Sequence, residues 1–232
     1  MDRITRKELK TDKFAVEVEH SVEYVAAHKK QAFQYGAIAL VVVLIAGGIW
    51  YYRSHQHEQR QQALAQAVDV MQAMVNPGGG PGLTFPSEAA KNAASEKAFK
   101  EVYDKYSGSA EAIVAATYLG AIETDMNKLS EAEKYFQIVA DSSDKNYASL
   151  GKLSLAQLYM GGGRQADGEK LLRSLIDNPT MFVSKEQATI ALAHGLTSSK
   201  PAEARKLLDP LKTERPAVGQ VAITLLGQLP AQ

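Results

Sequence analysis

The sequence of 232 residues contains no cysteine. This excludes disulfide scaffolds, thiolate zinc sites and cysteine nucleophiles. The chain also lacks an excess of either charge, because 26 Lys and Arg residues balance 26 Asp and Glu residues. Without a basic excess, nothing in the composition indicates nucleic-acid binding or a general attraction to anionic surfaces. The abundant residues Ala, Gln, Glu, Lys and Leu instead favour helix.

Charge is missing altogether from residues 31–52. The apolar part of this segment, residues 35–52, would span roughly 27 Å as a helix, close to the thickness of a bilayer core of about 30 Å. Aromatic residues at the end of the segment are typical of the membrane–water interface, and glycines within it allow close helix contact. The residues that define the expected transmembrane helix are Tyr35, Gly36, Gly47, Gly48, Trp50, Tyr51 and Tyr52.

A cleaved signal peptide is the main alternative, but 36 residues with six acidic side chains precede the run, and bulky residues follow Gly48. A buried globular helix is a third possibility. Orientation is balanced locally, since Lys29 and Lys30 face Arg53 and Arg60 across the span. The further basic residues of the tail, residues 1–34, favour an N-terminus inside the cell. The apolar spacing in this tail is compatible with a partly helical structure.

Beyond the span, the periodicity of apolar residues predicts one helix over 53–75, continuous with the membrane helix. Residues 76–87 are rich in Gly and Pro, so we expect neither helix nor strand there. Ser87 is a suitable N-cap for the next helix. A helical domain is then predicted over 88–232, and no stretch alternates long enough to indicate a strand.

Nearly the same nine residues occur three times at intervals of 36: EAEKYFQIV at 131–139, DGEKLLRSL at 167–175 and EARKLLDPL at 203–211. Helices joined by short loops at a fixed period are typical of a helical solenoid, with units here over 110–144, 147–180 and 184–216 and a terminal helix over 216–228. Small and large residues recur in register, as expected where helices cross. The predicted packing residues are Leu119, Gly120, Ala132, Phe136, Leu155, Ala156, Gly168, Leu172, Ala204 and Leu208.

The third position of the repeated nine residues changes the sign of its charge, since it is Glu133, Glu169 and Arg205, which indicates a solvated face. Ser130 and Glu133 have the spacing of a capping box, so we expect the second helix of the first unit to begin after Ser130.

The spacing of the predicted packing residues resembles that of the tetratricopeptide repeat, a helix–turn–helix unit of 34 residues, although the period here is 36. Together with the short tail and single span, the chain resembles the YfgM-like family of ancillary Sec translocon subunits. Their repeat domain is shared with CpoB-type division coordinators. The resemblance implies a bacterial inner-membrane protein with its N-terminus in the cytoplasm and its repeat domain in the periplasm. The partners it implies are a SecYEG-type translocon and periplasmic chaperones or emerging clients.

In tetratricopeptide arrays the first helix of each pair builds the inner, concave face. The register places Val114, Thr117, Ala121 and Thr124 there in the first unit and Leu150, Leu153, Gln157 and Met160 in the second. A repeat of 36 residues then gives Glu186, Thr189, Ala193 and Leu196 in the third. None of these twelve is the Lys or Asn that would hold a peptide carboxylate, so we predict a mildly apolar groove for protein segments. Packing of a neighbouring helix into this groove is the alternative.

Chemical motifs are weak. His55 and His57 would point apart on one helix, which disfavours a metal site. The run Gly161 to Arg164 lacks the Lys-Ser/Thr of a phosphate loop and falls where a turn is needed. His194 lies on an apolar helix. We therefore expect no catalytic residue, cofactor, metal or small-molecule substrate. The hypotheses are a membrane-anchored interaction protein of the Sec translocon, a scaffold for cell division, cell-wall or outer-membrane assembly and, least favoured, an enzyme.

Overall fold

The computed structural model describes residues 29–214 and 216–230, so most of the tail over 1–34 lies outside the described residues. The chain divides into two compact units, residues 1–58 and 59–232, which are described separately. The elements are α2 (Lys29–Gln72), β1 (Met74–Val75), β2 (Thr84–Phe85), α3 (Glu88–Lys105), α4 (Ala110–Asp125), α5 (Leu129–Ala140), α6 (Lys145–Gly161), α7 (Gln165–Asp177), α8 (Lys185–Leu196), α9 (Pro201–Leu208), the 3₁₀ helix η1 (Asp209–Thr213) and α10 (Pro216–Gln228). The predicted all-α class is confirmed.

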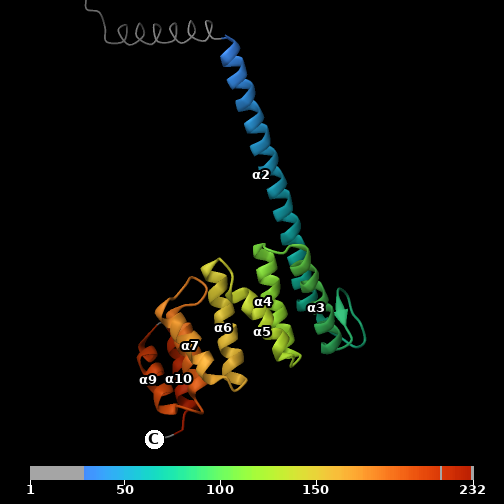
Figure 1. The fold of residues 1–232 in the computed structure, drawn as a ribbon. Helices are drawn as coiled ribbons and strands as arrows, with labels where there is room; N and C mark the ends of the chain where they lie inside the picture. The colour runs from blue at the N-terminus through green and yellow to red at the C-terminus, as the bar shows by residue number, and fades with distance from the viewer. Residues whose placement is uncertain (1–28, 215, 231–232) are drawn as a thin grey trace, which may run out of the picture. The chain divides into compact units, whose positions relative to one another are not determined.

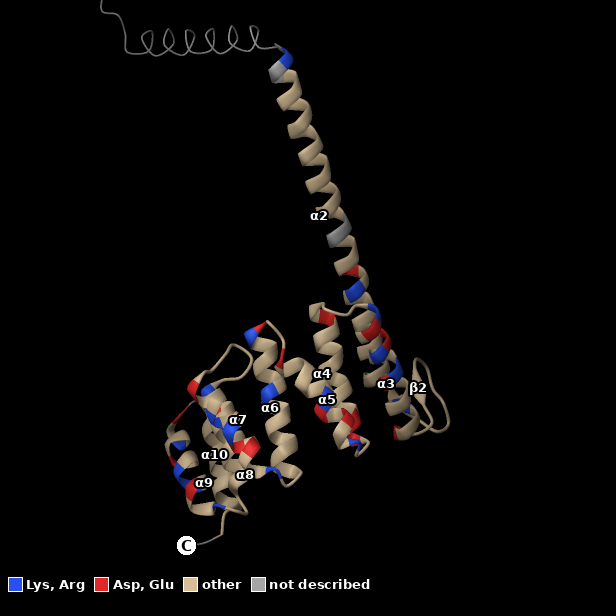
Figure 2. Cartoon of the chain, viewed as in Figure 1, with Lys and Arg blue, Asp and Glu red and all other residues tan. Residues whose placement is uncertain are grey.

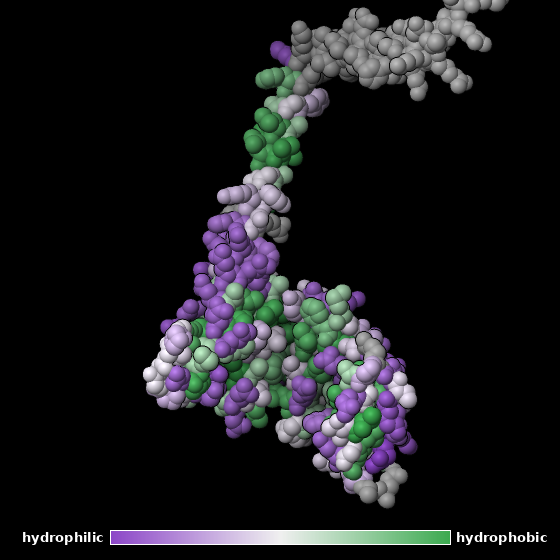
Figure 3. Space-filling model, turned by 180° about the vertical axis from the view of Figure 1, so that it is seen from behind, coloured by the Kyte–Doolittle hydropathy of each residue, from purple (hydrophilic) through white to green (hydrophobic). Residues whose placement is uncertain are grey.

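The described part of the first unit is the apolar beginning of α2. Phe33–Gln72 is the one helix of the described residues that is long and apolar enough to cross a membrane, with a mean hydropathy of 1.9 in its most apolar stretch and none of that stretch buried. In Figure 2 the part of α2 farthest from the repeats is drawn mostly in the tan of uncharged residues, and Figure 3 shows apolar side chains gathered on it. Such a surface is unfavourable in water and suits a lipid environment.

The second unit begins with the last turns of α2, which end at Gln72. The chain then makes a loop and resumes its direction, and two short parallel strands pair Met74 with Thr84 and Val75 with Phe85. The prediction that no strand forms within 76–87 is therefore wrong for β2. The reason is local: Gly79 and Gly82 adopt positive φ, and the N–H of Asn76 donates to the carbonyl of Phe85 at 2.8 Å. The turn brings the two ends of the loop close enough to pair.

Helix starts follow two different rules. Side chains cap α3, α4, α6 and α8; the hydroxyl of Ser87, for example, accepts the N–H of Ala90 at 3.2 Å, as predicted. By contrast α5 begins at Leu129 after Lys128, without a side-chain cap, so the predicted capping box at Ser130 is wrong. Asn127 has a φ of 58°, and the N–H of Lys128 donates to Glu123 O at 2.8 Å. This left-handed turn starts α5 before Ser130 is reached.

Three helix pairs follow one another, α4 with α5, α6 with α7 and α8 with α9, and each helix packs on the next (Figure 1). The second helices begin at residues 129, 165 and 201, each 36 after the previous one. Buried side chains form three clusters, of which one joins the end of α2 to α3 and α4. Each helix pair thus buries its apolar face against the neighbouring pair, as in a solenoid.

Close helix crossings require small residues at particular places. A Cβ atom at Gly120 would overlap the ring of Phe136, and one at Gly168 would lie 2.7 Å from the carbonyl oxygen of Ala156. Gly151, which was not among the predicted packing residues, allows α6 to approach the backbone of α5 at Ala140. All ten predicted packing residues lie in the interior: Leu119, Gly120, Ala132, Phe136, Leu155, Ala156, Gly168, Leu172, Ala204 and Leu208.

Candidate functional site

Two cavities lie along the face built by the first helices of the pairs. The larger, of about 670 Å³, is bounded by α6, α8 and α10, and the smaller, of about 520 Å³, by α4, α5 and α6. Gln157 and Gly161 line both cavities. The cavities therefore adjoin on α6, and together we call them the inner groove. Grooves of this size can take several side chains of a bound segment.

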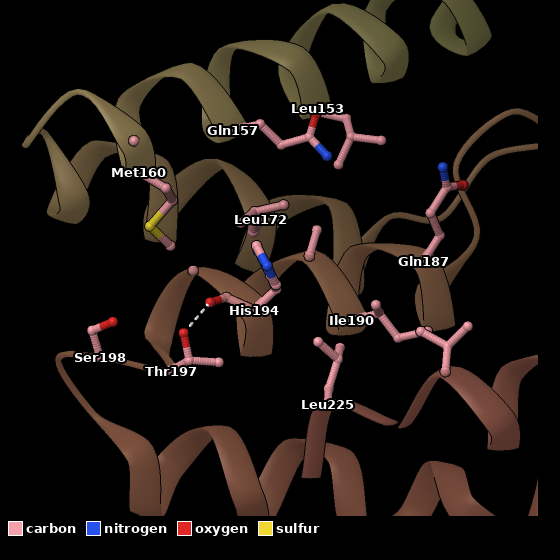
Figure 4. A pocket seen from close by; sticks show the side chains of 14 residues that line it. Leu153, Gln157, Met160, Leu172, Gln187, Ile190, His194, Thr197, Ser198 and Leu225 are labelled. Carbon is pink, nitrogen blue, oxygen red and sulfur yellow. Dashed lines mark hydrogen bonds between the residues drawn. The ribbon is translucent and has the colours of Figure 1, made fainter. Parts of the chain in front are cut away.

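Apolar side chains line the larger cavity, and polar ones stand among them (Figure 4). Leu153 and Met160 project from α6, Ile190 from α8 and Leu225 from α10, while Leu172 lies between them. The amides of two glutamines, the imidazole of His194 and the hydroxyls of Thr197 and Ser198 add hydrogen-bonding capacity. Such a lining can bury an apolar side chain and still satisfy a polar backbone beside it.

No formal charge lines the larger cavity, since none of its residues is Lys, Arg, Asp or Glu. Asp125 is the one such residue at the smaller cavity. A carboxylate or ammonium placed in the larger cavity would lose hydration without gaining an ionic partner, which is costly. The inner groove therefore favours uncharged segments over charged chain termini.

Most of the concave residues expected from the sequence meet in this groove. Thr117, Ala121 and Thr124 line the smaller cavity, Leu153 and Met160 line the larger, and Gln157 lines both. Val114 and Leu150 do not line either cavity; Leu150 packs against the core of the second half of the domain. These two side chains lie near the starts of their helices, away from the cavities.

The concave-face residues expected in the third repeat are wrong. Thr189, Ala193 and Leu196 are buried. The residues that line the cavity are Gln187, Ile190, His194 and Thr197. Each lies 37 residues after Leu150, Leu153, Gln157 and Met160, not 36. The pair Leu155-Ala156 is matched by the buried pair Leu192-Ala193, also 37 residues later. The connection before α8 is three residues longer than the one before α6, so the first helices need not keep the period of the second ones.

The helix α10 provides a wall of the larger cavity that was not predicted from the sequence. Val221 and Leu225 line the larger cavity from this helix, so the terminal helix is part of the groove as well as a cover for the core. Their spacing of four residues on an otherwise buried helix face is the signal that could have indicated this role. Only the folded chain shows that this face meets α6 and α8.

Ion pairs join successive repeats at the turn before each second helix. Arg164 Nη1 lies 2.7 Å from Glu133 Oε1, and Lys200 Nζ lies 2.8 Å from Glu169 Oε2. Lys128, 36 residues before Arg164, likewise contacts Glu96 of α3 at 3.4 Å. Glu133 and Glu169 therefore connect neighbouring repeats through ion pairs. This corrects the interpretation from sequence, in which these positions form only a solvated face. We call these three pairs the repeat ladder.

The ladder changes the acidity of its members. The pKa of Glu133 is lowered by hydrogen bonds from the hydroxyl of Tyr159 and from Arg164. The pKa of Glu169 is lowered by hydrogen bonds from Lys200 and Arg173. Burial, followed by the bond to Glu133, raises the pKa of Tyr159. These shifts fit structural ion pairs at a joint and need no catalytic role.

Other candidates for chemistry gain no support. Among the described residues there is no group of three or more His, Asp or Glu side chains that could hold a metal ion. The imidazole of His55 stacks on Tyr51, with ring centroids 6.4 Å apart. The helix α6 ends at Gly161, Gly162 is its C-cap and Gly163 adopts a φ of 82°, so this glycine run forms the turn to α7.

Comparison with known proteins adds one match. A family model described as a tetratricopeptide repeat-like domain matches residues 30–209. No curated protein matches the chain, and no solved structure matches it. Domains of this kind are typically non-enzymatic and bind other proteins.

Proposed function

Because the chain belongs to the tetratricopeptide repeat-like family, we propose that it is a membrane-anchored module that binds other proteins through the inner groove. The single observation that carries this proposal is the largely apolar inner groove, whose larger cavity is lined by no charged residue and whose smaller cavity is lined by one, Asp125. Apolar surface that remains open in a folded domain marks a place for a partner. The apolar start of α2 supplies the anchor.

We further propose that the module is an ancillary subunit of a SecYEG-type translocon, with the repeat domain in the periplasm near chaperones or emerging clients. A segment leaving a translocon is unfolded and presents apolar side chains beside uncharged backbone. The groove offers apolar side chains together with amides and hydroxyls, which suits such a segment. The resemblance in layout, a tail, one span and divergent repeats, supports the same assignment.

Photo-crosslinking in intact cells tests the partner. A crosslinking amino acid at Gln187, exposed at the rim of the larger cavity, should form adducts with translocon subunits, chaperones or secreted chains. The matched control is Lys170, exposed on α7 outside the inner groove. Adducts with division or cell-wall proteins alone would favour the envelope scaffold instead. Equal crosslinking from both positions would contradict groove binding.

Protease protection in spheroplasts tests the topology. If the domain is periplasmic, protease added outside should degrade residues 59–232 before the cells are lysed. Degradation only after lysis would place the domain in the cytoplasm, and the translocon assignment would then fail. The proposed orientation rests on the basic residues of the tail, because the charges beside the span are balanced.

A further inference from the structure

The connection between α7 and α8 has an apolar tip. Met181 is 87% exposed and Phe182 is 40% exposed. The corresponding connection between α5 and α6, residues 141–144, is three residues shorter and reads Asp-Ser-Ser-Asp. Loop tips in water are ordinarily polar, and no core packing requires a methionine at 181. The insertion in this repeat therefore adds apolar surface where its counterpart has none.

This connection is held in one conformation. The N–H of Thr180 donates to Val183 O at 2.9 Å, and the N–H of Val183 donates to Thr180 Oγ1 at 3.1 Å. The N–H of Met181 donates to Asn146 Oδ1 at 3.2 Å, and the hydroxyls of Thr180 and Ser149 lie 2.7 Å apart. Val183 is fully buried. The apolar tip is thus presented on a fixed turn, so little ordering entropy opposes its binding.

An aromatic pair supports the tip. The ring of Phe182 packs edge-on against Tyr147 of α6, with centroids 5.4 Å apart. Met181, Phe182 and Tyr147 together form what we call the Met181 knob. Lys145 and Lys185 are exposed close by in sequence, and Asp144 offsets part of their charge. A tyrosine ring, which has an apolar body and a polar hydroxyl, is typical of the interface between lipid and water, as are flanking lysines, and Phe182 adds apolar surface beside it.

The knob lies at the edge of the domain where the chain enters. Glu111, in the first turn of α4, pairs with Arg60 of α2 at 3.4 Å. In Figure 1 the start of α4, the start of α6 and the α7–α8 connection lie at one edge of the repeat array. Arg60 follows the expected span, which ends at Tyr52, by eight residues. Even a fully extended chain holds Arg60 within roughly 28 Å of the membrane.

We propose that the Met181 knob inserts into the interfacial region of the lipid bilayer. This inference rests on the membrane anchoring in the proposed function. Two apolar side chains would bind lipid weakly by themselves, but the anchor keeps them at high effective concentration beside the surface. The contact holds the edge of the domain against the membrane. The bilayer is favoured over a protein partner because lysines flank the knob, as at a lipid surface, and the anchor already supplies proximity.

Site-specific fluorescence in the full chain tests this inference, since the absence of native cysteine allows single labels. The variant Lys185→Cys, labelled with an environment-sensitive dye, reports beside the intact knob. Ile45→Cys reports from the span, and Ser198→Cys reports from the exposed turn after α8, at the opposite end of that helix from Lys185. Each is reconstituted into vesicles of phosphatidylethanolamine and phosphatidylglycerol that contain a quencher-bearing lipid. Quenching at 185 should exceed quenching at 198 by about threefold.

Replacing the knob provides the matched control. In Lys185→Cys with Met181→Ser and Phe182→Ser, quenching should fall to the level seen at 198. Met181→Ser alone serves if the double variant loses its helical circular dichroism, since the exposed Met181 side chain adds little to stability. Quenching at 45 without quenching at 185 overturns the inference but leaves the anchor intact, whereas no quenching at 45 overturns the anchoring itself. Shielding of 185 that appears only after membrane proteins are added also overturns it, because it assigns the knob to a protein partner.

Discussion

Arg164 and Glu133 form a direct joint between two repeats, with Nη1 and Oε1 2.7 Å apart. The guanidinium also lies over the ring of Tyr159, 3.8 Å from its centroid, and the hydroxyl of Tyr159 donates to the same carboxylate oxygen at 2.7 Å. One turn residue therefore ties the end of α6 to the preceding α5. Lys200 and Glu169 form the equivalent ion pair 36 residues later. The inner groove is built on helices that these joints hold in register.

Acid should weaken the repeat ladder. Glu133 and Glu169 have pKa values below the ordinary 4.5, because hydrogen bonds favour their charged forms. The unfolded chain therefore binds more protons at low pH, and the stabilisation that is complete above pH 4.5 is lost as the pH falls through the lower folded values. Melting followed by circular dichroism from pH 7 to pH 3 should show this loss. Glu133→Gln with Glu169→Gln should melt lower at pH 7 and depend less on acid, whereas Glu131→Gln, exposed on α5, should resemble the native chain.

The crossing at Gly120 should not tolerate a methyl group. In Gly120→Ala the new Cβ atom overlaps the ring of Phe136, and we expect a loss of about 2 kcal/mol in the free energy of unfolding. In Gly161→Ala the Cβ atom meets no atom within 4 Å, so that variant should be neutral or gain up to about 1 kcal/mol. Urea denaturation of the full chain measures both.

A second-site change refines this test. The later repeats place Leu172 and Leu208 where the first has Phe136, and Ala156 where the first has Gly120. Gly120→Ala combined with Phe136→Leu should therefore recover part of the lost stability, because the smaller side chain makes room for the methyl group. If the double variant loses more free energy of unfolding than the two single variants lose together, overlap at this crossing is not the cause of the loss in Gly120→Ala.

At position 127, in the turn before α5, glycine should be tolerated and alanine should be destabilising. Asn127 has a φ of 58°, and Gly163 occupies the same place 36 residues later with a φ of 82°. Asn127→Gly should change the free energy of unfolding by less than about 0.5 kcal/mol, while Asn127→Ala should cost about 1 kcal/mol, since a Cβ atom is disfavoured in this conformation. Thermal melting of the two variants side by side checks this. Equal stability of both would show that the turn does not depend on the left-handed residue.

Charge in the inner groove should weaken partner binding without unfolding the domain. Val221 and Ile223 are both exposed residues of α10, but only Val221 lines the larger cavity. Val221→Glu should reduce crosslinking from Gln187 by about tenfold, because a carboxylate there faces an apolar partner. Ile223→Glu should leave it nearly unchanged, and both variants should keep their melting temperatures. A similar reduction in both would mean that the groove is not the contact surface.

The sequence by itself determined the periodic part of this protein. Its 36-residue period located the second helices, and the uncharged run at 31–52 indicated the apolar helix. Local chemistry suffices for such features, because repeated packing contacts and an unbroken apolar run leave a direct mark on residue type. The sequence also placed small residues such as Gly120 and Gly168 at helix crossings, where a side chain has no room.

The tertiary structure decided what breaks the period. The shift to 37 residues in α8 changed which side chains face the groove, so His194 lines it while Ala193 is buried. The pairing of β1 with β2, the wall provided by α10 and the ladder from Arg164 to Glu133 join segments whose relation no local pattern records. Loop lengths and the path of the chain determine which side chains meet. The resulting contacts depend on the packing of the whole domain.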